Sequence, residues 1–160
     1  MLGITVLTVG KLKEAYWRAA CDEYVKRLGG YCKLNLVEVD ECRLPDQPSA
    51  AQIVAGTLAE GDQLLKCIPA GSFIISLCIE GREMDSQALA KQMAQLPLQG
   101  KSHITFIIGG SHGLSDRVKV RSHLRLSMSP MTFPHQMARV MLLEQIYRAL
   151  SINAGSKYHK

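Results

Sequence analysis

Three glycines within five residues mark a loop in the second half of the sequence, at residues 108–114. Gly109, Gly110 and Gly113 directly follow an apolar run, and glycine allows a backbone to approach a ligand closely and to adopt positive φ. Their order differs from the GxGxxG dinucleotide fingerprint, and the Gly-Lys-Ser/Thr ending of a phosphate-binding P-loop is absent. The spacing therefore indicates a loop for some other small ligand, or a purely structural tight turn.

Two further loops follow apolar runs, at residues 77–81 and 126–136. Open α/β sheets bind ligands at the carboxyl ends of their strands, where such loops meet. The later loop mixes hydroxyls, methionines and prolines ahead of an expected helix, and its backbone is suited to contact an adenine edge. Leu77, Leu126 and Met131 would supply apolar walls, which is the usual composition of a small cofactor pocket. Methionines that simply fill a core are the alternative.

Positive charge is concentrated near the C-terminus. Residues 1–100 carry 10 Lys and Arg against 12 Asp and Glu, whereas residues 101–160 carry 9 against 2, within a formal net charge of +5. Basic side chains occupy alternate positions at Arg117, Lys119, Arg121, His123 and Arg125. They share one face if the chain is extended, and a helix would align positions 117, 121 and 125. Either arrangement suits an RNA backbone, and an ordinary solvated surface is the alternative.

The number and spacing of the cysteines indicate the cellular compartment and argue against a metal site. There are five, every two at least ten positions apart, so the sequence has no zinc knuckle and no redox CxxC motif. Reduced thiols are expected, with Cys78 in the core. No apolar run approaches the ~20 residues that span a bilayer, and residues 1–9 lack the features of a signal peptide. We therefore expect a cytoplasmic protein without a metal ion or a membrane partner.

Short β-rich runs alternate with helical patterns along a chain that is expected to form one domain, residues 1–160. Strands are expected at residues 2–9, 34–39, 73–79, 103–108 and 124–128. Helices are expected at residues 13–28, at 50–66 after a Ser49 cap, at 85–96 before Pro97, from about Ser115, and at 135–153. This alternation predicts an α/β fold with a mainly parallel sheet sandwiched by helices.

The last expected helix is apolar over an arc wider than the ~100° stripe that faces a protein's own core. In a chain of 160 residues, some of that arc is expected to be buried against a second subunit, with Met137 or Met141 at the contact. The alternative is a central helix that its own chain covers on both sides.

Five segments carry a recognisable pattern, namely TVLTVGKLKE at 5–14, IIGGSHGL at 107–114, SPMTFPHQM at 129–137, LLEQIYRA at 142–149 and YHK at 158–160. In this order they resemble the RlmH family of SPOUT methyltransferases, over nearly the whole chain. The resemblance implies a homodimer with a C-terminal trefoil knot. It also implies methyl transfer from S-adenosyl-L-methionine to N3 of a pseudouridine in 23S-type large-subunit rRNA, expected on the assembled ribosome.

The resemblance places the cofactor against the three loops described above. The expected cofactor-binding residues are Leu77, Gly109, Gly110, Leu126, Ser127, Met128, Ser129, Pro130 and Met131. Arg117, Lys119, Arg121 and Arg125 are the expected RNA-binding residues. Two positions depart from the family pattern, because Pro130 replaces a more flexible or basic residue and Lys157 replaces a proline that often precedes the Tyr-His pair.

The terminal Tyr158 and His159 gain a catalytic role only through this resemblance, since a chain end is otherwise expected to be frayed. Histidine exchanges protons near neutral pH, so His159 is the candidate base for the N3 proton, and Tyr158 is suited to contact the target base. His135 is expected to fix the start of the last helix. A methyltransferase for a ribose 2′-hydroxyl or for tRNA, and a non-catalytic ribosome-binding module, are the rival interpretations.

Overall fold

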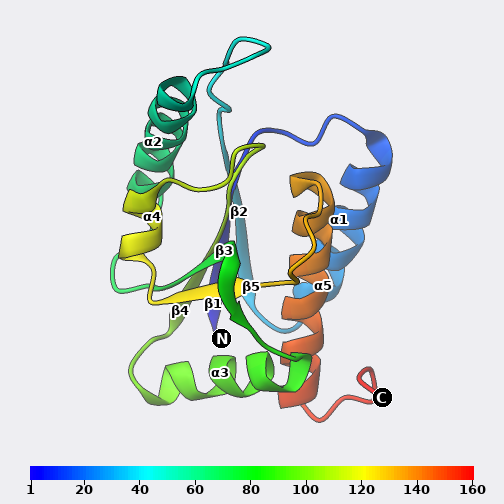
Figure 1. Cartoon of the computed structure of the whole chain (residues 1–160). Coiled ribbons are helices and arrows are strands. Elements are labelled where there is room, and N and C mark those ends of the chain that lie inside the picture. The colour runs from blue at the N-terminus through cyan, green and yellow to red at the C-terminus, as the bar shows by residue number, and fades with distance from the viewer.

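A five-stranded sheet forms the middle layer of the protein, for which the computed structural model describes residues 1–160 (Figure 1). The strands are β1 (Gly3–Val9), β2 (Lys33–Val39), β3 (Phe73–Glu83), β4 (His103–Ile108) and β5 (Leu124–Ser127), in the spatial order β2-β1-β4-β3-β5. Every pairing between neighbouring strands is parallel. The predicted α/β fold with a mainly parallel sheet is confirmed.

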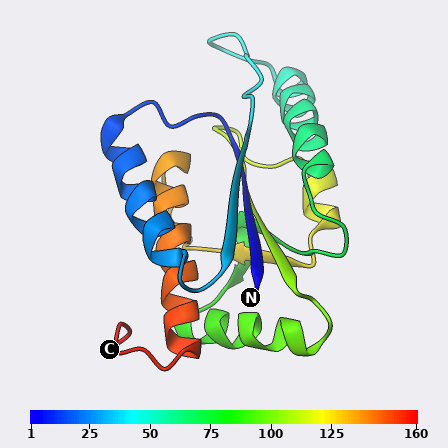
Figure 2. The ribbon, with the colours of Figure 1, turned by 180° about the vertical axis from the view of Figure 1, so that it is seen from behind.

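Helices cover both faces of the sheet, as the two opposite views show (Figure 2). One core joins α1 (Ala15–Leu28), α3 (Ser86–Leu98) and α5 (His135–Asn153) to the sheet, and a smaller core joins α2 (Ala50–Lys66) and α4 (Asp116–Arg121) to the other face. In β1, Ile4 and Val6 belong to the first core and Leu7 and Val9 to the second. Burial on both faces explains why the central strands are apolar without alternation.

The start of α2 follows its predicted cap. The Ser49 hydroxyl accepts a bond from the Gln52 backbone N–H, and the Gln52 side chain reaches back to the Ser49 N–H, which completes a capping box. Ser115 caps α4. The predicted end of α3 before Pro97 is wrong by two residues, because the helix continues to Leu98. A proline in the last turn removes only one hydrogen bond, and fully buried Leu96 holds that turn against the core.

β3 extends beyond its predicted end at residue 79. Its pairing with β5 shifts register, since Leu77 and Arg82 both pair with Leu126, and the residues between them bulge out. Gly81 allows this, because a Cβ there would lie 2.7 Å from the Arg125 carbonyl oxygen. Gly81, at the end of the loop expected at residues 77–81, is therefore the point where two backbones come into contact.

α5 has the predicted bounds, and its own chain covers much of its apolar arc. Leu142, Leu143, Ile146 and Ala149 are buried in the core shared with α1 and α3, whereas Met137 and Met141 are half-buried. Dimerisation through this helix and the C-terminal knot stay predictions. The five cysteines are all free thiols, with Cys78 buried as expected. No helix is both long and apolar enough to cross a membrane, and no group of three or more His, Cys, Asp or Glu is arranged to hold a metal ion.

Candidate cofactor cavity and C-terminal tail

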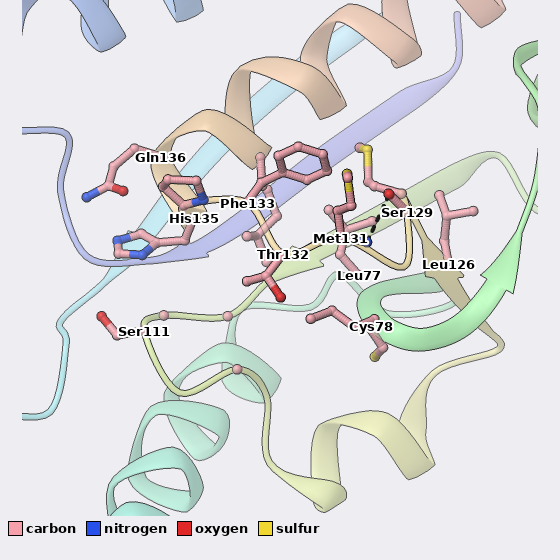
Figure 3. Close-up of a pocket in the computed structure, with 18 residues that line it drawn as sticks. Leu77, Cys78, Ser111, Leu126, Ser129, Met131, Thr132, Phe133, His135 and Gln136 are labelled. Atoms are coloured by element: carbon pink, nitrogen blue, oxygen red, sulfur yellow. Dashed lines mark hydrogen bonds between the residues drawn. The ribbon is translucent and has the colours of Figure 1, made fainter.

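A cavity of about 570 Å³ opens at the carboxyl ends of three adjacent strands, β4, β3 and β5. Three segments surround it: the bulge of β3, the glycine loop after β4, and the chain between β5 and α5 (Figure 3). The lining residues are Leu77, Cys78, Ile79, Ile108, Gly109, Gly110, Ser111, Gly113, Leu126, Met128, Ser129, Met131, Thr132, Phe133, Pro134, His135, Gln136 and Ala138. The three loops selected from the sequence therefore meet in one place.

Seven of the nine expected cofactor-binding residues line this cavity, and two do not. Ser127 is buried, and its hydroxyl donates to the Ser129 carbonyl oxygen at 3.2 Å. Pro130 is exposed outside the lining. The Ser129 hydroxyl in turn accepts a bond from the Met131 backbone N–H at 3.0 Å, which shapes the turn that contains both residues. Met131 is 72% exposed, so it stands at the mouth of the cavity.

The glycine loop is closed on itself. Gly110 and Gly113 form an isolated bridge, and the Gly113 N–H donates to the Gly110 carbonyl oxygen at 3.0 Å. A Cβ on Gly109 would lie 2.5 Å from the Gly113 carbonyl carbon and oxygen, so Gly109 is required by contact within the loop. The positive φ anticipated for these glycines occurs only at Gly113, at 79°.

The loop before α5 contributes more residues to the cavity than the sequence predicted. Phe133, His135 and Gln136 also line the cavity, together with Thr132 and Pro134. They lie in the same segment as the predicted residues, so extending the predicted site along that segment would have included them. Burial lowers the pKa of His135; the Glu41 carboxylate opposes that shift, and the Arg139 guanidinium adds to it. The first residue of α5 therefore faces the cavity as well as starting the helix.

The predicted basic stripe is divided between a helix and a strand, because Arg117 and Arg121 lie four positions apart on α4, as the helical arrangement expected, whereas Arg125 lies on β5. Arg117 pairs with Asp62 at 2.7 Å and Lys119 with Glu80 at 2.6 Å. Arg121 ends α4, and Arg125 on β5 donates from Nε to the Lys119 carbonyl oxygen. Arg121 and Arg125 are exposed and have no acidic partner within 4.0 Å, so they are the freest cations of the set.

His123 belongs to the fold rather than to this basic surface. Its Nδ1 accepts a bond from the Ile74 backbone N–H at 2.9 Å, and its ring stacks on Phe73 with centroids 4.8 Å apart. Burial, Lys101 and Arg121 lower its pKa, in that order. A neutral imidazole at this position completes the hydrogen bonding of an interior strand.

The C-terminal tail is ordered against α5 and does not line the cavity. The Tyr158 hydroxyl donates to Glu144 Oε1 at 3.0 Å, and its ring meets that of Tyr147 edge-on. The Arg148 guanidinium lies 4.7 Å from the centre of the Tyr158 ring and also pairs with Glu144. Burial and Glu144 raise the pKa of Tyr158. The tail therefore packs against α5.

His159 Nδ1 lies 3.2 Å from Arg148 Nη1. A guanidinium can only donate, so this contact requires a lone pair on Nδ1 and places the ring proton on Nε2. In this arrangement the expected base has its lone pair turned towards Arg148, and accepting a proton requires that contact to break.

A second cavity of about 400 Å³ lies between the first one and the tail. It shares Leu126 and Met128 with the first cavity and reaches Met141, Glu144 and Gln145 on α5. Since Glu144 also holds Tyr158 and Arg148, the anchor of the tail forms part of a surface that continues to the first cavity.

A parallel α/β sheet with a loop-built cavity at its carboxyl edge is the usual arrangement for binding a small ligand, and the sequence places the chain within one enzyme class. It matches the family described as "Predicted SPOUT methyltransferase" over residues 2–159 and belongs to that family. Two relatives are both named "Ribosomal RNA large subunit methyltransferase H". The one from Clostridium novyi (strain NT) is 48% identical over 99% of this chain and 100% of its own length. The one from Bifidobacterium adolescentis is 50% identical over 98% and 99%.

Two solved structures share the fold at low identity. A probable methylase family protein from Haemophilus influenzae Rd KW20 matches with a TM-score of 0.55 at 15% identity, over 100% of this chain and 72% of that chain. A probable methyltransferase from Bordetella pertussis Tohama I matches with a TM-score of 0.57 at 17% identity, over 92% and 95%. These likenesses concern the fold, whereas membership of the family rests on the sequence.

Proposed function

We propose that the protein transfers a methyl group from S-adenosyl-L-methionine to N3 of a pseudouridine in large-subunit rRNA. The observation that carries this proposal is the cavity where β4, β3 and β5 end, in a SPOUT methyltransferase chain that is 48–50% identical to two proteins named for large-subunit rRNA methylation. The cytoplasm, where assembled ribosomes are found, is the proposed location, and a homodimer the proposed form.

The residues present fit that cofactor. The cavity of about 570 Å³ falls within the range of roughly 300–1,000 Å³ that is usual for small ligands. Leu77, Leu126 and Met131 give apolar walls suited to a flat adenine ring, and the Ser129 and Gly110 backbones supply polar contacts. When bound, the sulfonium group supplies an activated methyl, so the protein has to align a nucleophile with it and exclude water.

The chain's own residues would then manage the proton on N3. An imide nitrogen must lose this proton before it can attack, and His159 would accept it once its Nδ1 has left Arg148. Tyr158 would stack on the target base or donate its hydroxyl to it. Both side chains rest on Glu144 and Arg148, outside the cofactor cavity, so the proposal requires the tail to move or to act on the cavity of a second copy.

Calorimetric titration with S-adenosylmethionine tests the first half of the proposal. We expect the unmodified protein to bind in the micromolar range. The Leu126→Arg variant should lose binding, whereas Lys66→Gln, a change on the distant surface, should keep it. A non-catalytic ribosome-binding module would show no heat of binding. Methylation of ribosomes from a deletion strain, followed by mass analysis of the nucleosides, tests the second half. Product on a ribose 2′-hydroxyl or on tRNA would favour the rival enzymes.

Removal of residues 157–160 tests the tail. We expect methyl transfer to be lost while the dimer persists, because the expected dimer contact lies on α5. His159→Ala should slow single-turnover transfer by about 10²- to 10⁴-fold, the usual cost of removing a general base. Lys157→Ala is the matched control and should keep the rate. A His159→Ala rate within a few-fold of the unmodified protein would assign the proton to another acceptor.

Light scattering tests the dimer. Met141 is half-buried and lines the second cavity on α5, so Met141→Glu should weaken self-association, whereas Lys91→Glu on α3 should not. A stable monomer of the unmodified protein at micromolar concentration would contradict the proposal.

A further inference from the structure

A third cavity of about 410 Å³ lies between the sheet and α1, and it shares no lining residue with the candidate cofactor cavity. Its floor is formed by β1 and β2, where Thr8 pairs in register with Glu38. The remaining walls come from the loop after β1, from α1 and from Arg139 on α5. The lining residues are Val6, Thr8, Lys11, Leu12, Arg18, Cys21, Asp22, Leu36, Glu38 and Arg139. We refer to it as the β1–α1 cavity.

Two polar groups that line the β1–α1 cavity are buried without a hydrogen-bond partner in the protein. Arg139 is 6% exposed; its Nη1 donates to Glu38 at 2.6 Å and its Nη2 to the Gly10 carbonyl oxygen at 3.1 Å, but its Nε has no acceptor. Thr8 is 4% exposed, and its hydroxyl is also unpartnered. Buried polar atoms are satisfied in nearly all cases, so two orphans around one cavity indicate a polar ligand.

The charges around the β1–α1 cavity favour an anion. Glu38 is already paired with Arg139, which leaves Lys11 and Arg18 against the single carboxylate of Asp22. Arg18 uses one nitrogen to hold the Leu12 and Lys13 carbonyl oxygens and has no acidic partner. The free donors are thus a guanidinium N–H, a hydroxyl and an ammonium, which together suit the oxygens of a phosphate group.

The β1–α1 cavity adjoins the candidate cofactor cavity through the first turn of α5. Ala138 lines the cofactor cavity, and Arg139, the next residue, lines this one. Gly10, whose carbonyl oxygen Arg139 holds, directly follows β1 at the carboxyl edge of the sheet. The two cavities are therefore lined by consecutive residues of α5.

We infer that the β1–α1 cavity binds a backbone phosphate of the RNA substrate, next to the nucleotide that is methylated. This inference rests on the proposed function. Arg139 Nε and the Thr8 hydroxyl hold the phosphate oxygens, and Lys11 and Arg18 attract the strand at the rim.

Phosphate binding is testable without activity, by following the Arg139 Nε–H signal in ¹H–¹⁵N NMR spectra of the full chain. Inorganic phosphate and uridine 5′-monophosphate should each shift this signal saturably, whereas uridine and acetate should not. Thr8→Val removes a hydroxyl that has no protein partner, so the fold should be kept while the phosphate affinity falls. Lys11→Gln should weaken binding by roughly twofold to fivefold, the range for one accessible ion pair. Lys13→Gln removes the same charge two positions away, outside the lining, and should have no effect.

Steady-state methylation separates this inference from the proposed function. Thr8→Val should raise the KM for rRNA several-fold and leave kcat close to that of the unmodified protein. If the unmodified protein transfers no methyl group to rRNA, the proposed function fails and the phosphate titration is judged by itself. If transfer occurs and Thr8→Val keeps both the KM and the phosphate affinity, the inference is overturned.

Two other results would also overturn it. One is an unshifted Arg139 signal at saturating phosphate. The other is an Arg139 shift on deletion of residues 157–160 in the absence of any added anion, because the C-terminal carboxylate of a second copy would then be the occupant.

Discussion

A single methyl group added at each glycine of the 109–113 loop should have three different effects, and the order of these effects follows from the surroundings. At Gly109 the new Cβ would lie 2.5 Å from the Gly113 carbonyl group, which is backbone and cannot swing away. At Gly110 it would lie 3.1 Å from Val9 Cγ1, a side-chain atom that can yield. At Gly113 it would meet nothing within 4 Å, but φ is 79°.

These differences give approximate magnitudes. Overpacking costs about 1–3 kcal/mol, and Gly109→Ala should lie at the upper end because the bridge between Gly110 and Gly113 must open. A left-handed backbone costs a non-glycine residue roughly 1–2 kcal/mol, which is the expected loss for Gly113→Ala. Gly110→Ala should be close to neutral, since a methyl group stabilises by about 0.4–1 kcal/mol through the unfolded chain and offsets the Val9 contact.

Urea unfolding measures the free energies, and calorimetry with S-adenosylmethionine measures the consequence for the cavity. Gly109→Ala should weaken binding by about tenfold or more, equivalent to at least ~1.4 kcal/mol, because the opened loop no longer lines the cavity. A Gly109→Ala protein that is as stable as Gly110→Ala would show that the loop adapts freely. Our inference that a Cβ at position 109 clashes with the Gly113 carbonyl group would then be wrong.

Arg121→Gln should weaken rRNA binding more than Arg117→Gln, because the Arg117 side chain already pairs with Asp62. Arg121→Gln should also lower the slope of log affinity against log salt concentration by ~0.7. Equal effects of the two variants in a filter-binding assay would contradict this prediction. Burial raises the pKa of the Glu60 carboxyl, so its ionisation destabilises the fold. Glu60→Gln should therefore gain stability that grows as pH rises through that raised pKa, when urea unfolding at about pH 8 is compared with about pH 5. Iodoacetamide should label partly exposed Cys67 before Cys32, whose pKa burial raises to about 11; peptide mass analysis reports the order.

Local sequence signals predicted most of the elements because each depends on near neighbours. The apolar run 103–108 became β4 with the same bounds, and Ser49 and Ser115 cap the helices expected to follow them. The cavity was also predictable in outline. Parallel strands end at one edge of the sheet, so the loops that follow them have to meet there.

Contacts between distant residues could not be predicted in this way. Arg139 and Glu38 are 101 positions apart, and only folding shows that this ion pair spans β2 and α5. The register shift of β3 depends on Arg125, whose carbonyl oxygen approaches Gly81. Likewise, no periodic pattern in the sequence predicts the hydrogen bond between Tyr158 and Glu144.

The wide apolar arc of α5 shows why one helix can mislead a prediction based on periodicity. Successive residues in a helix point about 100° apart, and this helix uses four directions: Ala138 faces the candidate cofactor cavity, Arg139 the β1–α1 cavity, Leu142 the core and Glu144 the tail. An arc with so many intramolecular partners need not mark a subunit contact along its whole width. Any dimer contact on α5 is therefore confined to its half-buried side, which includes Met137 and Met141. For this reason the Met141→Glu measurement tests the dimer more directly than the width of the apolar arc does.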